Sequence, residues 1–207
     1  MPNVSLSLKL EDYSFTQKEE KAALMKSKGC CIFCNTPVKE HAHFVKVNKG
    51  IYSACSMCKD VLSLDKLPKG KEGKIIFLPE IPQNELNNLI RAIWYVESIS
   101  EDYEEEYDIL NIVISILHNR EDAASHYYAS GINETSVLVK FLYTLSPDEY
   151  RLRSKGLYGL RWLPAKELYV DELPYWYENM KKFSPDTWGV LLNTYKKKIL
   201  SLKKKKK

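Results

Sequence analysis

Apolar positions recur with a helical period through the C-terminal part of the chain. Beyond Pro82 they return every three to four residues almost to the end, which is the pattern of helices that bury one face. Ser184 followed by Pro185 is a typical helix start, because proline fits the first helical position. The predicted helices cover residues 83–99, 102–119, 121–129, 135–145, 171–183 and 186–201.

The N-terminal part carries shorter apolar segments. Residues 4–10 alternate between apolar and polar, and residues 74–78 form a short apolar run, so both segments are predicted as strands. Thr16 and Glu19 have the spacing of a capping box, which predicts a helix from Thr16 to about Lys28. This part of the chain therefore mixes short strands with short helices.

All five cysteines of the 207-residue chain lie between residues 30 and 58. Four of them form two Cys-x-x-Cys pairs separated by 20 residues, which is the spacing of a structural zinc site. Each pair can direct two thiolates to one side of a tight turn, and two such turns complete a tetrahedron around Zn²⁺. The spacing predicts one structural zinc ion with the ligands Cys31, Cys34, Cys55 and Cys58.

Four thiolates leave no coordination position for water or substrate, so this zinc would hold the fold together and would not catalyse a reaction. The alternative is a set of four buried thiols without a metal. Cys30 stands outside the two pairs. It is interpreted as a packed or partly exposed free thiol, with the role of an alternative ligand left open.

Two histidines lie between the cysteine pairs. In the segment EHAHFV, Glu40, His41 and His43 stand where an HNH endonuclease, which this segment resembles, carries its catalytic histidine on the first strand of a ββα-metal module. On one strand His41 and His43 would share a face. Against catalysis, Lys59 follows the second cysteine pair, where that family commonly has asparagine, and a lysine would repel Mg²⁺. A packing role for the histidines is the main interpretation, and a nuclease or nucleic-acid-binding protein using them is the alternative.

Together these patterns predict an α+β fold that is mostly helical. A small HNH-like zinc-binding ββα module is expected over residues 1–80, followed by a helical region over 81–202 that packs on it. Residues 203–207, a run of five lysines, are expected to be a disordered tail.

Charge and hydropathy limit the function classes. The net charge is +4, but eight lysines lie between Lys196 and Lys207, so residues 1–195 carry a net charge of −4. A slightly acidic body does not favour nucleic-acid binding. Charged residues within the first twelve positions interrupt any secretory signal, and the most apolar run, 109–117, is too short to span a bilayer. The protein is therefore predicted to be cytoplasmic.

Two further segments carry a more specific resemblance. IIFLPEIPQNELNNLIRAIWY (75–95), which follows the cysteine module, and GLRWLPAK (159–166) together resemble the IcmJ family, also called DotN, of the type IVB (Dot/Icm) secretion system of intracellular bacterial pathogens. The resemblance runs through most of the chain in order, from the N-terminal strand and helix to Leu163-Pro164. Residues after 195 have no counterpart in it.

The resemblance implies a non-enzymatic adaptor. Such proteins bind the cytoplasmic C-terminal extension of the DotL-like coupling ATPase, in the complex that recruits effector proteins for export. It also implies an HNH-like module that has lost catalysis and kept its four zinc-binding cysteines. The expected location is the cytoplasm, in peripheral association with the inner-membrane secretion complex.

Three other features are candidates for contacts with partners. Tyr158, Arg161 and Trp162 are residue types enriched at interface hot spots, although a buried loop anchor would use them equally well. The acidic run 101–107 is interpreted as a solvated helix start. The lysine tail could contact anionic lipid weakly, at about 1 kcal/mol per residue near the surface.

Overall fold

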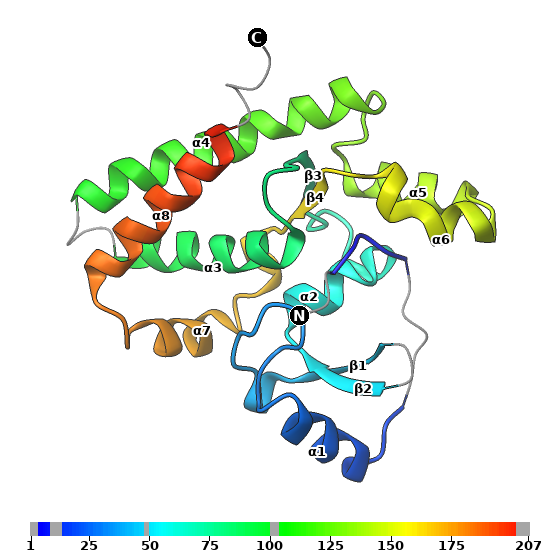
Figure 1. The fold of residues 1–207 in the computed structure, drawn as a ribbon, viewed down its shortest axis with the longest axis horizontal. Helices are drawn as coiled ribbons and strands as arrows, with labels where there is room; N and C mark the ends of the chain where they lie inside the picture. The colour runs from blue at the N-terminus through cyan, green and yellow to red at the C-terminus, as the bar shows by residue number, and fades with distance from the viewer. Residues whose placement is uncertain (1–3, 9–13, 48–49, 100–103, 202–207) are drawn as a thin grey trace.

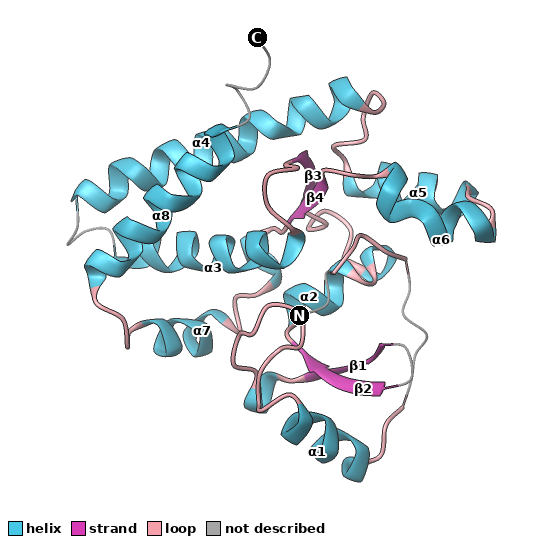
Figure 2. Ribbon diagram, in the orientation of Figure 1, coloured by secondary structure: helices cyan, strands magenta, loops and turns pink. Residues whose placement is uncertain are grey.

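The computed structural model describes residues 4–8, 14–47, 50–99 and 104–201. Within them the protein is a mostly helical α+β structure with two small two-stranded sheets (Figure 2). The N-terminal sheet lies in the lower part of the view, and the second sheet lies among the helices (Figure 1). The predicted class, α+β and mostly helical, is therefore confirmed.

The helices and the strands that the structure describes have the following bounds. The helices are α1 (Gln17–Lys26), α2 (Ser56–Val61), α3 (Gln83–Ile99), α4 (Glu104–Tyr127), α5 (Thr135–Thr144), α6 (Pro147–Gly156), α7 (Leu173–Met180) and α8 (Pro185–Leu200), with short 3-10 helices η1 (Lys39–His41), η2 (Leu64–Lys66) and η4 (Lys166–Leu168). The strands are β1 (His43–Val47), β2 (Gly50–Ala54), β3 (Lys74–Phe77) and β4 (Leu160–Leu163).

Local sequence signals set the start of the N-terminal module. The Thr16 hydroxyl accepts a hydrogen bond from the backbone N–H of Glu19, and the Glu19 carboxylate accepts one from the backbone N–H of Thr16, which is the predicted capping box of α1. β1 and β2 pair as an antiparallel hairpin, with Val47 opposite Gly50, and α2 follows directly. The order β1–β2–α2 places the second cysteine pair at the start of α2.

The second sheet joins distant parts of the chain. β3 pairs antiparallel with β4, so that Ile75 lies opposite Trp162 across 86 intervening residues. Ile75, Ile76 and Trp162 are fully buried, and β3 packs against α4. The predicted division of the chain at residue 80 remains a prediction, although this sheet contains one strand from each side of it.

The long helices form the upper layer in Figure 1, where α4 and α8 run side by side above α3. α7 packs on the other side of α3 and carries Trp176 against Trp94, with ring centroids 6.4 Å apart. Tyr95 of α3 packs edge-on against Tyr177 of α7 and also contacts Trp188 of α8. Aromatic side chains therefore make contacts among α3, α7 and α8, which also border a cavity of about 430 Å³.

Most of the predicted elements are present. The α1 start, the hairpin and α2 match the prediction, and the predicted helices 83–99, 135–145, 171–183 and 186–201 agree with observed helices to within three residues at each end. The expected acidic helix start over residues 101–107 is described only from residue 104, where α4 begins. The lysine tail, 203–207, lies outside the described residues.

Three predictions about secondary structure were wrong. Residues 4–8 form no regular strand, although Ser7 exchanges backbone hydrogen bonds with Val61 and Leu64; residues 9–10 of that prediction lie outside the described residues. The predicted helices 102–119 and 121–129 are one continuous helix, α4, because no helix-breaking residue separates them. The segment LRWL had not been predicted as a strand, yet it forms β4.

Helix α6 was also missed, and its signal was present. Ser146 caps the helix by accepting from the backbone N–H of Glu149, the Glu149 side chain accepts from the backbone N–H of Ser146, and Pro147 occupies the first turn. The low apolar content of the helix, which has no buried residue, removed the hydrophobic period that the prediction relied on.

Candidate metal centre

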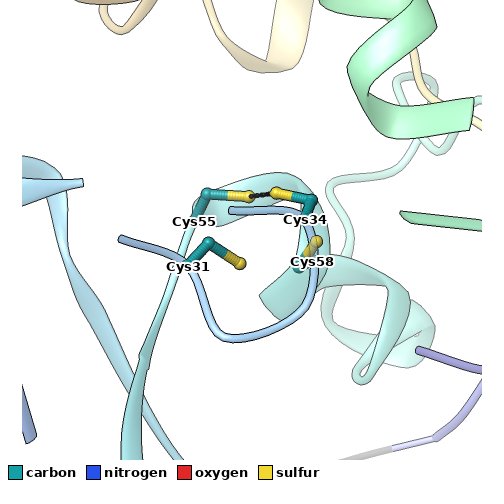
Figure 3. Close-up of side chains that lie close together, drawn as sticks. All are labelled: Cys31, Cys34, Cys55 and Cys58. Carbon is teal, nitrogen blue, oxygen red and sulfur yellow. Dashed lines mark hydrogen bonds between the residues drawn. The ribbon is translucent and has the colours of Figure 1, made fainter. Parts of the chain in front are cut away.

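The two cysteine pairs meet beside the N-terminal hairpin. Cys31 and Cys34 lie in the turn that follows α1, Cys55 is the residue before α2, and Cys58 lies in its first turn. One Sγ atom from each of the four lies within 4.8 Å of the others, and each residue is at most 4% exposed. Figure 3 shows the four side chains converging, and the sulfurs of Cys34 and Cys55 lie 3.6 Å apart.

Turn geometry explains how each pair presents its sulfurs on one side. The first pair is closed by backbone hydrogen bonds from Asn35 N–H to the Cys31 carbonyl, 2.9 Å, and from Cys31 N–H to the Thr36 carbonyl, 2.8 Å. Asn35 adopts the left-handed conformation, φ +60°, which asparagine tolerates better than most residues. The second pair uses the first turn of α2, where Lys59 N–H donates to the Cys55 carbonyl.

Helix α3 supplies hydrogen bonds to three of the four sulfurs. The Arg91 guanidinium donates to Cys55 Sγ at 3.0 Å and to Cys34 Sγ at 3.4 Å through the same nitrogen. The Asn87 amide donates to Cys58 Sγ at 3.3 Å. The helical region therefore covers the cysteine cluster with polar groups as well as apolar ones.

Arg91 is an unusual buried cation. Its side chain is 1% exposed, and the guanidinium lies 5.0 Å from the Trp176 ring centroid. Burial alone would lower the pKa of Arg91, but the charges of the Cys55, Cys34 and Cys58 thiolates outweigh it and raise that pKa above its usual value. The guanidinium is therefore stabilised by negatively charged thiolates. Thiolate is also the form in which cysteine binds a metal.

The positive charge of Arg91 is not enough to ionise all four thiols. Hydrogen bonds from Cys31 and the other two cysteines hold the pKa of Cys34 well below its usual value, whereas burial raises the pKa of Cys55 well above it. The pKa of Cys58 is raised by its hydrogen bond to Cys31. A divalent cation removes this conflict, because it replaces the protons and binds all four thiolates.

The donor set suits zinc. Four convergent sulfur ligands match the tetrahedral four-cysteine sites in which zinc is structural, and the protein contributes every ligand. Cys31, Cys34, Cys55 and Cys58, the four residues predicted from their spacing, can therefore hold one metal ion. Within the described part of the chain they form the one group of three or more histidine, cysteine or acidic side chains that could do so.

The histidines do not join this cluster. His41 lies in η1 and not on the strand, so the expectation that His41 and His43 share a strand face is wrong. The His41 ring packs on Tyr175 of α7 at 4.7 Å between ring centroids. His43 is the first residue of β1, and burial, followed by the charge of Lys59, lowers its pKa. Lys59 itself forms an ion pair with Asp60 at 3.2 Å.

The three residues of the candidate interface segment, Tyr158, Arg161 and Trp162, differ in their burial. Trp162 is fully buried, donates its ring N–H to the Glu72 carbonyl and acts as a core anchor. Tyr158 is 64% exposed, and Arg161 is half-buried. Cys30 is half-buried and lies outside the metal cluster.

The sequence did not reveal Arg91, Asn87 and Asn88 as part of the site. The Asn88 side chain donates to the Cys34 carbonyl at 3.0 Å and accepts from Arg91 at 2.9 Å. These three residues lie within two turns of a helix whose other residues are largely buried and apolar. Asn87 and Arg91, which are polar and lie on the buried face of a predicted helix, were the available signal, but nothing local indicates what that face contacts.

No protein-family model matches this chain, and no curated protein matches it in sequence. Among the residues that the structure describes, none of the helices combines the length and apolar character needed to cross a bilayer.

Proposed function

We propose that this protein is a zinc-stabilised, non-catalytic adaptor of a type IVB secretion coupling complex. It binds the cytoplasmic C-terminal extension of the coupling ATPase and supports the recruitment and export of effectors. The proposal that the protein is non-catalytic rests on the closed metal site. Four buried sulfurs from two turns converge there, and helix α3 covers them. A site of this kind holds a fold together.

The placement of the histidines also supports an adaptor. An HNH nuclease needs a histidine that activates water beside a bound divalent cation. Here the His41 ring packs on the Tyr175 ring, and the positive charge of Lys59 helps to lower the pKa of His43. The β1–β2–α2 order with a cysteine pair on each side of the hairpin is compatible with an HNH-like scaffold that keeps only its structural metal.

The link to the secretion system rests on the resemblance to the IcmJ family. The two segments that carry it, 75–95 and 159–166, are adjacent in space, because β3 and β4 are hydrogen-bonded to each other. Gln83 extends this contact, since its side-chain oxygen accepts from the Trp162 backbone N–H and its nitrogen donates to the Trp162 carbonyl. The shared sheet brings the two segments that carry the resemblance into one part of the fold.

A direct binding experiment tests the adaptor role. The zinc-loaded protein is mixed with the coupling ATPase, and in parallel with an ATPase truncated before its C-terminal extension, and complexes are measured by calorimetry and size-exclusion chromatography. We expect a stoichiometric complex with the full ATPase and none with the truncated one. Failure to bind either protein would contradict the proposal.

The nuclease alternative has its own test. The parent and a His41→Ala/His43→Ala double variant are incubated with plasmid DNA and Mg²⁺ or Mn²⁺. The adaptor role predicts that neither cleaves DNA and that the double variant binds the ATPase as the parent does. Metal-dependent cleavage by the parent that disappears in the double variant would establish the alternative function.

A further inference from the structure

A small cavity with two arginines in its lining lies away from the cysteines, beside strand β4. It has a volume of about 200 Å³ and lies between the N-terminal segment 4–6, the start of α3, the end of α6 and β4. The polar residues of its lining are Ser5, Gln83, Arg153, Ser154, Tyr158 and Arg161. None of these residues takes part in the metal centre. Gln83 is already hydrogen-bonded to Trp162 and Asn87.

Arg161 lines the cavity from β4, and several of its N–H donors have no hydrogen-bond partner within the described structure. Its Nε donates to the Ile81 carbonyl at 2.7 Å, and one terminal nitrogen donates to the Leu160 carbonyl at 2.7 Å. A guanidinium has five N–H donors, so these two bonds leave three for a ligand within the described structure. The two carbonyls fix the plane of the guanidinium without neutralising its charge.

Arg153 is held in a similar way from α6. Its Nε donates to the Leu6 carbonyl at 3.0 Å, and its terminal nitrogens donate to the Tyr150 carbonyl at 2.9 Å and to the Ser7 hydroxyl at 3.1 Å. The guanidinium also lies 4.2 Å from the Tyr150 ring centroid. All of these partners are uncharged, so Arg153, like Arg161, is oriented but keeps its full positive charge.

In the described part of the chain, neither arginine forms an ion pair with a carboxylate. Glu80 acts on Arg161 from a distance, but its ion pair goes to Arg120 at 2.6 Å. Burial accordingly lowers the pKa of Arg161, in contrast to Arg91, whose pKa is raised by thiolates. Two oriented, partly buried cations in one cavity without a counter-ion are costly unless an anion binds there.

We propose that this cavity binds a small oxyanion, a phosphoryl or carboxylate group, between Arg153 and Arg161. Guanidinium groups match both oxyanions because their N–H donors form a rigid fork. The hydroxyls of Ser5, Ser154 and Tyr158 can donate to further oxygens of the ligand. The site is independent of the metal centre and of the adaptor role.

The test uses the full-length, zinc-loaded protein labelled with ¹⁵N, in which the arginine Nε–H resonances are followed by NMR. Inorganic phosphate and acetate are titrated separately, with sodium chloride at the same ionic strength as the reference. We expect saturable shifts of the Arg153 and Arg161 resonances with at least one anion. Saturation with phosphate alone assigns a phosphoryl ligand, and saturation with acetate alone assigns a carboxylate.

Variants decide whether the two arginines form the site. Arg161→Gln and Arg153→Gln are each expected to weaken binding at least tenfold, whereas Arg161→Lys, which keeps the charge and loses the fork, is expected to have an intermediate effect. Arg151→Gln is the matched control, because Arg151 lies on the same helix, is exposed and pairs with Asp148. Thermal melting and zinc content confirm that each variant is folded.

Three results would overturn the proposal. The first is that the chemical shifts change linearly with phosphate and acetate concentration, as they do with chloride. The second is saturation at arginines other than Arg153 and Arg161. The third is an equal loss of binding in Arg151→Gln. If Arg161→Gln does not fold, the NMR titration of the parent protein decides the question, because it reports on anion binding without any substitution.

Discussion

The elements around the cysteines are short, whereas those of the helical region are long. β1 and β2 have five residues each and α2 has six, but α3, α4 and α8 have 17, 24 and 16. A two-stranded hairpin is marginal on its own in water, and so is a helix of fewer than about 12 residues. The long helices instead bury aromatic side chains against one another, with Trp94, Trp176 and Trp188 each at most 7% exposed.

This contrast gives a physical reason for a structural metal in the cysteine module and not in the helical region. A structural zinc site contributes apparent binding energies of about 10–16 kcal/mol, which is comparable to the total stability of a typical domain. The helical region obtains its stability from apolar area removed from water. The two parts meet at Arg91, which donates to the cysteine sulfurs and lies over the ring of Trp176.

Removing one ligand tests the comparison most severely. Cys55→Ser is expected to leave less than about half an equivalent of zinc and to unfold the cysteine module, because zinc binding supplies folding energy of about 10–16 kcal/mol there. Amide exchange should become fast over residues 30–66, while much of the helical circular dichroism remains. Cys30→Ser, outside the cluster, is the control and should behave like the parent. A Cys55→Ser protein that melts like the parent would show that the module does not depend on metal.

Cutting a large aromatic side chain from the helical region should have the next largest effect. Trp188→Ala is expected to cost about 3–5 kcal/mol, the usual range for a buried tryptophan. Tm should fall by about 2–4 °C for each kcal/mol, and the zinc content should stay at one equivalent. Val190→Ala on the same helix, at a residue that is 68% exposed, should change Tm little. Loss of zinc in Trp188→Ala would mean that the two parts are not separately stabilised.

Arg91→Leu probes the junction between the two parts. Without the guanidinium, the zinc-bound cluster loses hydrogen bonds to two sulfurs and a compensating positive charge. Zinc affinity, measured by competition with a chromogenic chelator, is expected to fall about 10–100-fold, as it does when the groups that hydrogen-bond a metal ligand are removed.

The matched control for this junction is Arg151→Leu, which removes an exposed arginine from α6 and should leave zinc affinity unchanged. Arg91→Lys should restore only part of the affinity, because an ammonium group lacks the planar fork of arginine. Unchanged affinity in Arg91→Leu would indicate that the helical region merely covers the metal site.

The smallest expected effect concerns the pH dependence of the cysteine module. Burial lowers the pKa of His43 below its usual value of about 6.5, so as pH falls the unfolded chain binds this proton before the folded protein does. The stabilisation is complete above about pH 6.5 and is lost as pH falls through the folded pKa. His43→Gln should therefore flatten the decrease of Tm below about pH 6.5, with zinc content monitored at each pH. An identical pH profile in the variant would place the titrating group elsewhere.

The metal ligands were predictable because their signal is local. A Cys-x-x-Cys pair sets its own turn, and the 20-residue separation allows two turns to meet, so the cluster of Cys31, Cys34, Cys55 and Cys58 follows from spacing. The capping box at Thr16 is equally local. The break predicted within α4 was wrong because a change in hydrophobic pattern does not end a helix when no Gly or Pro interrupts it.

Local sequence was sufficient to predict the cysteine cluster, the start of α1 and the period of the long helices, because each depends on residues within one short segment of the chain. The tertiary structure alone decided that LRWL becomes β4, since that strand exists only when β3 supplies its hydrogen bonds. It likewise decided that Arg91 faces sulfur whereas Arg153 and Arg161 face a shared cavity. The charge of an arginine is visible in the sequence, but its counter-ion is set by elements that arrive from far along the chain.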